Sequence, residues 1–239
     1  MDVMDLKILV IIPAYNEEKN IKQVVDNLIH NYPQYDYVII NDCSSDNTKK
    51  ILEKNNYNHI NLPVNLGIGG GVQTGYKYAL ENGYDIAIQM DGDGQHDPKF
   101  FSDIIDSIIN GEADIVIGSR FIEKDGFQST KIRRIGINFL SNLIKIVCGK
   151  RVKDVTSGYR AVNRKFIEIY AKEYAQDYPE PEAIVNAAMH NARILEYPVI
   201  MSERLGGESS ISHFKSVYYM IKVSLAIILY RITFNKRRI

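Results

Sequence analysis

The sequence predicts an α/β protein with a mostly parallel, doubly wound sheet flanked by helices. Short aliphatic runs alternate with segments of helical spacing, and short loops connect them. This alternation is typical of βαβ units, whose right-handed crossovers make neighbouring strands parallel. Polar residues directly follow several predicted strands, at the edge where open α/β sheets bind ligands. A chain of 239 residues, 45% of them hydrophobic, suits one large domain of this class.

The first half of the chain has the most regular elements. The unbroken run Lys7–Ile12 predicts a strand buried on both faces, and an apolar stripe with helical spacing begins after Glu18. Further strands are predicted at Tyr37–Ile40, Asn58–Leu62, Asp85–Met90 and Asp114–Gly118. Further helices are predicted to end at Leu52 and to span Val72–Leu80 and Pro98–Ile109. Gly67–Gly71 is expected to form a tight turn or a phosphate-binding loop before its helix.

The second half is less regular. A basic amphipathic helix is predicted at Lys131–Val147, and a polar turn at Asp154–Arg160 precedes another helix. The remaining predictions are loops at Asp177–Pro181 and Arg204–Ser212, a strand at Ala192–Val199 and an apolar helix at Val217–Ile232. We therefore divide the chain into a main domain, residues 1–212, and a C-terminal amphipathic helix, residues 213–239.

The overall charge is balanced, with 29 Lys and Arg against 29 Asp and Glu. This balance argues against a protein that binds nucleic acid through bulk positive charge. The C-terminal end is nevertheless basic, because residues 209–239 contain no acidic residue. Their basic residues are Lys215, Lys222, Arg231, Lys236, Arg237 and Arg238. Such an uneven distribution indicates contact with a membrane or a polyanion at this end.

Cysteine usage and apolar runs bear on the compartment. Cys43 and Cys148 lie far apart and outside any metal-binding spacing, so we expect two reduced thiols in a cytosolic protein. We expect neither a signal peptide nor a conventional spanning helix, because no uninterrupted apolar run reaches 18 residues. A C-terminal helix with basic flanks would instead lie at the cytoplasmic face of the cell membrane as a peripheral contact. The alternative is a helix that packs in the core or in a homo-oligomer.

The segment Asp91-Gly92-Asp93 is the strongest indication of chemistry. Two carboxylates two residues apart, directly after a buried strand, repel one another unless a cation neutralises them. A site with few carboxylates is completed by water and phosphate oxygens, which favours Mg²⁺ or Mn²⁺. Gln95 and His96 are candidates to complete or orient this site. The alternative is an acidic β-turn, in which Asp-Gly pairs are common.

Other polar residues at the same predicted edge are candidates for binding a nucleotide. Asp42 ends a predicted strand, where a carboxylate can accept a hydrogen bond from a nucleobase or a ribose hydroxyl. Ser44, Ser45 and Asp46 are better explained as helix caps. Guanidinium groups bind phosphate oxygens through paired hydrogen bonds, although a single surface arginine is often only solvated. The candidate arginines are Arg120, Arg133, Arg134, Arg160 and Arg204.

Six motifs occur in a fixed order along the chain. They are Ile11–Glu18 (IIPAYNEE), Asn41–Asp46 (NDCSSD), Asn65–Gly67 (NLG), Asp91–Pro98 (DGDGQHDP), Gly118–Arg120 (GSR) and Thr156–Arg160 (TSGYR). In combination they resemble family-2 glycosyltransferases of the GT-A type. The similarity covers residues 7–212 and is strongest to the branch of dolichyl-phosphate mannose synthase and bacterial polyprenyl-phosphate glycosyltransferases. This resemblance implies a GT-A-type, Rossmann-like fold.

The resemblance also implies the donor site. Pro13, Tyr15 and Glu17 would line the nucleoside pocket, and Ile40 and Asp42 would contact the base and the ribose. The donor would be a UDP- or GDP-linked sugar. Its diphosphate and the metal would be held by Asp91, Gly92, Asp93 and Gln95.

Further residues would act on phosphate groups, again by resemblance. Arg120 would contact phosphate of the donor or the acceptor, and Asp154 matches an acidic position that is important in the polyprenyl-phosphate branch. Arg204 and the Gly206–Ser210 loop match a basic loop that closes over the phosphates. Ser210 departs from that branch, which often has Lys there. Gly92 and Cys43 also depart, since Ala and Gly are usual at these positions.

The expected reaction is an inverting, metal-dependent transfer of a sugar to a membrane-linked acceptor, polyprenyl phosphate in the leading interpretation. A lipid phosphate is already an anion, whereas a sugar hydroxyl requires a general base. Glu180 and Glu182 are candidates for that base, with exposed loop acids as the alternative. One competing function is transfer to a hydroxyl of a cell-wall or capsular polysaccharide. The others are a nucleotidyltransferase and a non-enzymatic nucleotide-sugar-binding subunit.

Overall fold

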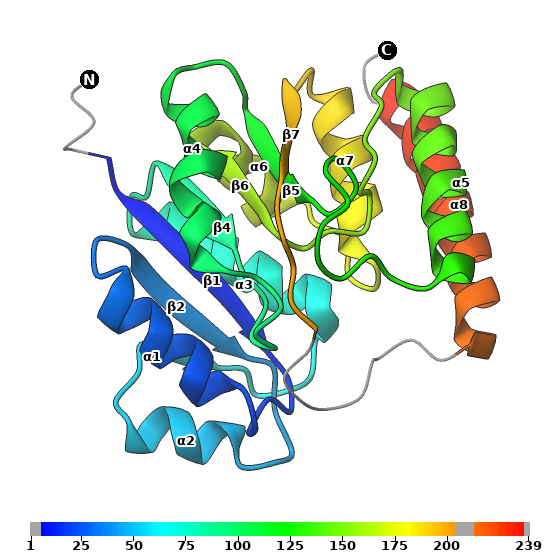
Figure 1. Ribbon diagram of the computed structural model, residues 1–239. Helices are drawn as coiled ribbons and strands as arrows, with labels where there is room; N and C mark the ends of the chain where they lie inside the picture. Colours follow the sequence, from blue (N-terminus) through cyan, green and yellow to red (C-terminus); the bar gives the residue numbers. More distant parts are fainter. Residues whose placement is uncertain (1–5, 204–212, 237–239) are drawn as a thin grey trace.

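The computed structural model describes residues 6–203 and the helix at 213–236, the latter with side chains from 219 to 234. Its central feature is a seven-stranded sheet with strand order β3-β2-β1-β4-β6-β5-β7 (Figure 1). The strands are β1 (Ile8–Ala14), β2 (Asp36–Asn41), β3 (His59–Asn61), β4 (Ile86–Gln89), β5 (Ile115–Ser119), β6 (Arg160–Asn163) and β7 (Ile194–Pro198). All neighbouring pairs are parallel except those of β6 with β4 and β5. The predicted α/β class with a mostly parallel sheet is therefore confirmed.

Helices cover both faces of the sheet. They are α1 (Ile21–Asn31), α2 (Thr48–Lys54), α3 (Gly67–Glu81), α4 (Phe101–Ile109), α5 (Lys131–Cys148), α6 (Arg164–Lys172), α7 (Pro179–Met189) and α8 (His213–Lys236), with a short 3₁₀ turn, η2 (Pro98–Phe100). Alternate residues of β1 separate the two cores. Val10 and Ile12 pack in a cluster with residues of α1 and α4, whereas Leu9 and Ile11 pack in a cluster with residues of α3 and α5–α8. Burial on both faces explains the unbroken aliphatic run of this strand.

The glycine-rich segment is the first turn of α3, so the predicted turn or phosphate loop before the helix is wrong. The glycines permit close packing instead. A Cβ at Gly69 would lie 1.9 Å from the carbonyl oxygen of Ala175, and one at Gly75 would lie 2.2 Å from Cγ2 of Ile11. The main-chain N–H of Gly69 donates to the carbonyl of Gln176 at 3.0 Å.

Two elements of the second half differ from the prediction. The loop expected at 177–181 is in part the start of α7, because Pro179 and Pro181 lie in the first turn, where helix N–H groups need no internal partner. The sequence predicts a polar turn and the start of a helix where the structure has strand β6. Its four residues are too few for an alternating pattern, and it begins with the buried Arg160.

The C-terminal helix α8 is longer than the predicted segment and packs against α5 and α7. Val223 and Ile227 are fully buried in this contact, and the side-chain amide of Asn186 donates to the hydroxyl of Tyr230 at 2.7 Å. Within the described residues, no helix combines the length and the apolar character needed to cross a bilayer. One side of α8 therefore belongs to the core of the main domain.

Candidate functional site

The predicted ligand edge is present in the structure. The carboxyl ends of β1, β2, β4 and β5 lie at the same edge of the sheet, and the segment leading into β6 returns to it (Figure 1). The loops there carry Tyr15, Asp42, Asp91, Arg120 and Gly158. Residues from five separate segments are thus brought together, as expected for an open α/β sheet.

The β1–β2 side of this edge contains the expected nucleoside residues. Pro13 and Ile40 are register partners and are buried, and a Cβ at Gly71 would lie within 4.0 Å of both side chains. Asp42 is also buried, and its Oδ1 accepts from the main-chain N–H of Leu66 at 2.7 Å. Tyr15, in contrast, is 50% exposed. The four residues thus lie together at the carboxyl ends of β1 and β2, and Tyr15 is the exposed one among them.

Glu17 lies differently from its predicted neighbours. It is buried, its carboxylate accepts from the side chain of Asn20 at 2.7 Å, and its N–H donates to Oγ1 of Thr48 at 2.9 Å. Its carbonyl also accepts from the first residues of α1. These bonds join the loop after β1 to the starts of α1 and α2. The carboxylate of Glu17 is buried among them.

The acidic loop, residues 91–97, follows β4. The side chain of Asp91 is 33% exposed, whereas Asp93 is buried and accepts from the N–H of Gln95 at 3.0 Å. The amide of Gln95 donates to the carbonyl of Ser202 at 3.2 Å. Only one of the two aspartates therefore presents much of its carboxylate to solvent.

Two glycines allow close approaches around the acidic loop, Gly158 to Asp91 and Gly92 to Pro13. A Cβ at Gly158 would lie 3.0 Å from Oδ2 of Asp91 and 3.0 Å from Nε2 of Gln89. A Cβ at Gly92 would lie 3.2 Å from the carbonyl oxygen of Pro13. Gln89 is fully buried and donates to Oδ1 of Asp91 at 3.5 Å. Gln89 was not predicted as a site residue, since nothing in an apolar strand marks one inward amide.

His96 belongs to the acidic loop, and its side chain is buried. Its Nδ1 accepts from the main-chain N–H of Asp91 at 3.0 Å, and its ring stacks on Tyr159 with centroids 4.7 Å apart. Burial lowers the pKa of His96 to about 4, so the imidazole is neutral at pH 7. His96, which we predicted to complete or orient the metal site, is therefore an uncharged side chain that holds the main chain of Asp91.

Arg120 and Asp154 form a closed ion pair on the β5 side. Nε and Nη2 of Arg120 donate to the two carboxylate oxygens of Asp154, both at 2.7 Å. The main-chain N–H of Arg120 donates to the same carboxylate at 3.1 Å, and Nη2 also donates to Thr156 at 3.0 Å. Asp154 is fully buried, and the main-chain N–H groups of Lys153 and Asp154 donate to the carboxylate of Glu196. Asp154 thus holds Arg120 and faces no open space.

Two more arginines surround this pair. The guanidinium of Arg134 lies 3.3 Å from the ring centroid of Phe121, and that of Arg120 lies 5.0 Å from the same ring. Burial and the charge of Arg120 lower the pKa of both Arg133 and Arg134, which still leaves them charged at pH 7. We call Arg120, Arg133, Arg134 and Asp154 the arginine corner.

The two candidate bases of α7 have different surroundings. Burial raises the pKa of Glu180, Arg160 lowers it, and the charge of Asp91 raises it again. Burial also raises the pKa of Glu182, whose charged neighbours are Asp177 and Lys222 instead. Asp91 of the acidic loop is therefore among the charges that act on Glu180, whereas Lys222 of α8 is among those that act on Glu182.

Arg160 lies inside the protein on β6, not in a polar loop as expected. Its Nη2 donates to the carbonyl of Ser157 at 2.6 Å. The rings of Tyr76, Tyr170 and Tyr174 pack on one another nearby, with centroids 5.1–5.5 Å apart. Arg160 is thus placed to support the segment before β6. Arg204 and the Gly206–Ser210 loop lie outside the described residues.

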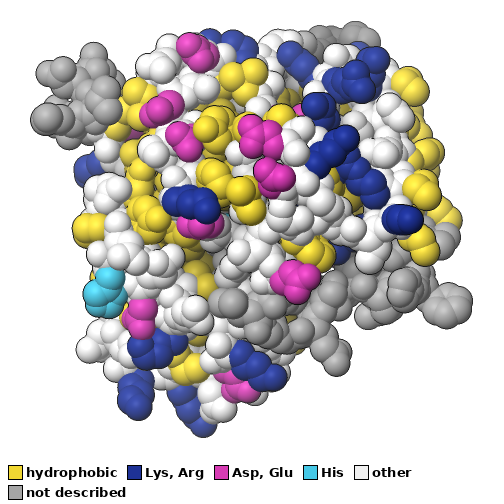
Figure 2. Space-filling view, viewed as in Figure 1, with side chains coloured by type: hydrophobic (Ala, Val, Ile, Leu, Met, Phe, Trp, Pro, Cys, Tyr) yellow, Lys and Arg dark blue, Asp and Glu magenta, His cyan; other side chains and the backbone are white. Residues whose placement is uncertain are grey.

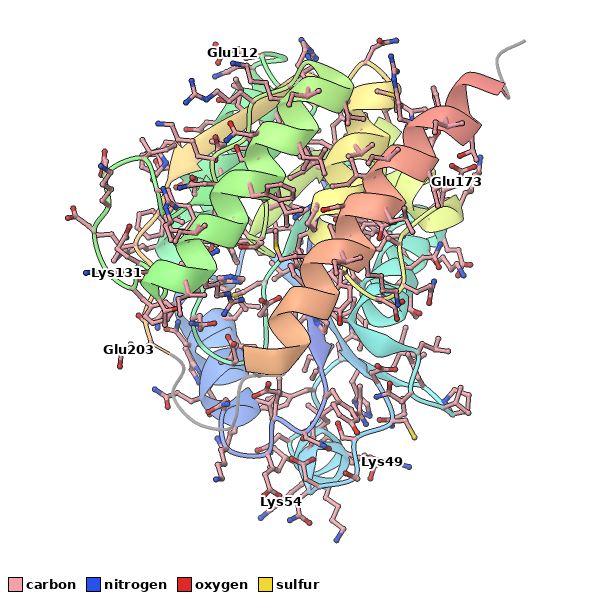
Figure 3. The ribbon with its side chains drawn as sticks, turned by 90° about the vertical axis from the view of Figure 1, so that its right-hand side faces the viewer. Lys49, Lys54, Glu112, Lys131, Glu173 and Glu203 are labelled. Atoms are coloured by element: carbon pink, nitrogen blue, oxygen red, sulfur yellow. The ribbon has the colours of Figure 1, made fainter. Side chains whose placement is uncertain are left out.

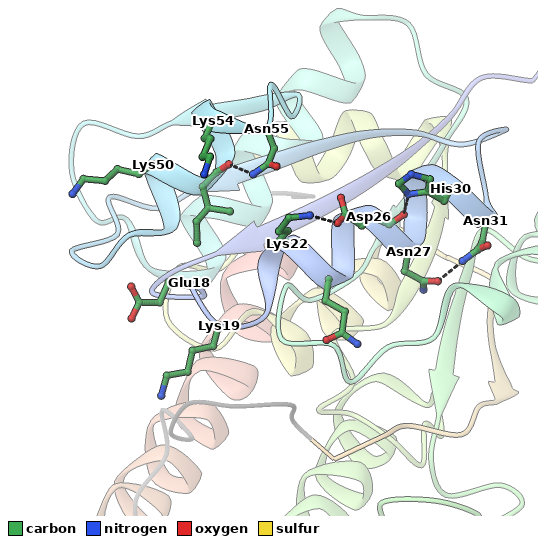
Figure 4. A pocket seen from close by; sticks show the side chains of 12 residues that line it. Glu18, Lys19, Lys22, Asp26, Asn27, His30, Asn31, Lys50, Lys54 and Asn55 are labelled. Atoms are coloured by element: carbon green, nitrogen blue, oxygen red, sulfur yellow. Dashed lines mark hydrogen bonds and ion pairs between the residues drawn. The ribbon is translucent and has the colours of Figure 1, made fainter.

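The cavities in the described part of the chain include two that differ in size and position. One of about 900 Å³ lies between the outer surfaces of α1 and α2 and is lined by lysine, amide and acidic side chains (Figure 4). A smaller one of about 280 Å³ adjoins the acidic loop and includes Gly94, His96 and Asp97 in its lining. No three His, Cys, Asp or Glu side chains converge as a metal cage among the described side chains, residues 6–203 and 219–234.

Comparison with known proteins gives consistent matches. The model of "Glycosyl transferase family 2" matches residues 9–170. The chain is 34% identical over 219 residues to a UDP-N-acetylglucosamine–dolichyl-phosphate N-acetylglucosaminyltransferase of Methanococcus voltae, covering 82% of this chain and 85% of that protein. It is 28% identical over 229 residues to a polyprenol monophosphomannose synthase of Mycolicibacterium smegmatis, covering 90% and 85%.

A solved structure supports the fold. Glucosyl-3-phosphoglycerate synthase of Mycobacterium tuberculosis, in complex with Mn²⁺, uridine diphosphate and phosphoglyceric acid, aligns with a TM-score of 0.71. The alignment covers 95% of this chain and 79% of that chain, at 19% sequence identity.

Proposed function

This chain belongs to glycosyl transferase family 2, and we propose that it transfers a sugar from a nucleotide-diphosphate sugar to polyprenyl phosphate. The observation that carries the proposal is the pairing of two opposite charge environments at one sheet edge. The acidic loop lies after β4 and the arginine corner lies after β5, two strands away. A diphosphate donor with its cation suits the first, and an anionic acceptor suits the second.

The acidic loop is the proposed site for Mg²⁺ or Mn²⁺. Asp91 and Asp93 would hold the ion, and Gln95 is the next candidate. Their donors are all oxygens and the carboxylates are few, which fits a hard cation that keeps water and takes phosphate oxygens. A bound cation supplies positive charge that stabilises the leaving diphosphate.

The carboxyl ends of β1 and β2 are the proposed nucleoside site. Tyr15 offers an exposed ring for stacking on the base, and Pro13 and Ile40 provide an apolar floor. Asp42 is held in place by the N–H of Leu66, which leaves one oxygen for the base or the ribose. Glu17 holds the loop after β1 in place through its hydrogen bonds with Asn20 and Thr48.

The arginine corner is the proposed acceptor site. Asp154 fixes the guanidinium of Arg120, and Arg133 and Arg134 add two charges at the start of α5. The acceptor phosphate attacks the anomeric carbon from the face opposite the diphosphate. The bond to the diphosphate breaks, its electron pair leaves with the nucleotide, and the configuration inverts. No proton has to be removed from a phosphate dianion.

An apolar surface adjoins this corner and is the proposed contact with a lipid bilayer. Helices α5 and α8 lie side by side, and neither sequence contains an acidic residue (Figure 3). Hydrophobic side chains gather along the side of the molecule that these helices form (Figure 2). The exposed ones are Ile132, Ile135, Phe139 and Ile146 on α5 and Ile221, Leu225, Ile228, Leu229 and Ile232 on α8. We call them the α5–α8 face.

The combination of apolar residues and excess positive charge favours an anionic bilayer as the partner of this face. Flotation with vesicles containing phosphatidylglycerol tests this contact. Wild-type protein is expected to float, and Ile135→Glu combined with Leu225→Glu is expected to remain at the bottom. Val64→Glu is the matched control, because Val64 is 57% exposed on the other half of the molecule. Equal flotation of the double variant would refute the contact.

Transfer to a hydroxyl of a growing polysaccharide is the second candidate, and Glu180 is the observation that favours it. A carboxyl with a raised pKa beside the acidic loop has the surroundings of a general base. Replacement by glutamine separates the two reactions. Glu180→Gln is expected to spare transfer to a phosphate and to stop transfer to a hydroxyl.

A donor panel tests the proposed reaction. UDP- and GDP-linked sugars are incubated with Mn²⁺, with and without polyprenyl phosphate, and released nucleoside diphosphate is measured. Release is expected with one nucleotide class and to depend on polyprenyl phosphate. Release that is indifferent to this lipid but rises with an oligosaccharide acceptor would favour the second candidate.

A further inference from the structure

We propose that His96 is a positioning residue that fixes Asp91 in the orientation needed to bind the divalent cation. The proposal rests on the metal-binding role proposed for Asp91 and Asp93. It concerns a residue that contacts neither the sugar donor nor the acceptor in the proposed reaction, and that acts through Asp91.

The hydrogen bond to Nδ1 defines the form of the imidazole. The main-chain N–H of Asp91 donates to Nδ1 at 3.0 Å, so Nδ1 carries no proton and the ring proton is on Nε2. Nε2 lies 3.8 Å from Oδ2 of Asp91, too far for a hydrogen bond but near enough for its N–H dipole to attract the carboxylate. A single ring therefore contacts both the main chain and the side chain of the same aspartate.

The imidazole itself is held rigidly. Its side chain is only 4% exposed, and its ring lies almost parallel to that of Tyr159, with 13° between the planes. The hydroxyl of Tyr159 donates to the carbonyl of Asp97 at 2.7 Å, and its ring packs edge-on against Phe101. The ring of Tyr159, from the segment leading into β6, thus fixes both His96 and the end of the acidic loop.

Asp91 is held from two sides by this arrangement. The buried ring of His96 contacts it from within the loop, and Gln89 from β4 donates to its Oδ1, while a Cβ at Gly158 would already lie 3.0 Å from its Oδ2. The free-energy cost of orienting the carboxylate is then met during folding, not when the cation binds. Outer residues of this kind affect metal affinity by about 10- to 100-fold in other proteins.

Binding of Mn²⁺ measured by electron paramagnetic resonance tests the proposal without an assay of activity. His96→Ala removes both contacts with Asp91. His96→Asn keeps an acceptor close to the position of Nδ1. His190→Ala is the matched control, because His190 is a partly buried histidine that bonds a main-chain carbonyl at the end of α7. Asp91→Asn serves as the variant that lacks one of the two proposed carboxylate ligands.

The dissociation constant for Mn²⁺ is expected to rise about 10-fold or more in His96→Ala and to stay within about 3-fold of wild type in His96→Asn. His190→Ala is expected to leave it unchanged. Raising Mn²⁺ is expected to restore the turnover of His96→Ala, which a purely structural defect would not allow.

A wild-type dissociation constant in His96→Ala, with binding lost in Asp91→Asn, would overturn the role of His96 alone. If His96→Ala does not fold, equal weakening in His96→Asn and in a third variant, His96→Leu, would overturn it. Absence of Mn²⁺ binding by the wild type, alone and with UDP or GDP, would instead refute the proposed metal site.

Discussion

The acidic loop and the arginine corner hold charge at the same sheet edge in different ways. Asp91 keeps a third of its side chain in contact with solvent, and a neutral histidine supports it. Asp154 is fully buried and is closed in an ion pair with Arg120. A charge that must meet an incoming cation stays accessible, whereas a charge that orients a guanidinium can be enclosed. This difference in burial supports the proposal that Asp91 binds a cation and that Asp154 orients Arg120.

The largest effect on activity is expected for Asp91→Asn, in the acidic loop. Transfer is expected to fall to background, a loss of at least about 100-fold, because the donor diphosphate loses its charge compensation. The free energy of unfolding is expected to be unchanged or slightly higher, since repulsion from Asp93 is relieved. Nucleoside diphosphate release and urea unfolding measure the two effects. Near-wild-type turnover with metal present would refute the metal assignment.

Asp154→Asn, in the arginine corner, is expected to act mainly by lowering the free energy of unfolding. It leaves the buried guanidinium of Arg120 without its charged partner, which costs about 3–5 kcal/mol of unfolding free energy. Urea unfolding measures this loss. An unchanged midpoint would show that the pair contributes little to the fold.

The ion pair of Arg193 and Asp114 is more open than that of Arg120 and Asp154, because the side chain of Arg193 is 54% exposed, and we expect its loss to have a smaller effect. It lies at the opposite end of β5, where Arg193 holds the pKa of Asp114 at about 2. Because this pKa is below the unfolded value of about 3.9, the pair stabilises the fold at higher pH. The difference in stability between wild type and Asp114→Asn is expected to be constant above about pH 5 and to shrink from pH 4 to pH 2. A difference that grows on acidification would contradict this assignment.

The strands and the polar loops of the first half can be predicted from the sequence alone, because each is visible as a local pattern of residues. The aliphatic strands β1, β2 and β4 and the polar residues that follow them are visible as runs and breaks, so Asp42 and Asp91 were found at the correct edge. The fold class followed from the same alternation of strands and helices.

The missed features depend on contacts between distant segments. Arg120 and Asp154 are 34 residues apart, and no local pattern shows that they form a pair. His96 and Tyr159 are brought together only by β6, a strand too short to be seen in the sequence. The glycines of α3 were assigned to a turn, although tertiary packing against Gln176 and Ile11 requires them. Each of these features thus depends on contacts between residues that lie far apart in the sequence.

A crystal structure with Mn²⁺ and either UDP or GDP tests the central proposal most directly. We expect the metal between the carboxylates of the acidic loop and the two phosphates of the nucleotide, with the base beside Tyr15 and Asp42. A nucleotide bound elsewhere, with no metal at Asp91 and Asp93, would contradict it.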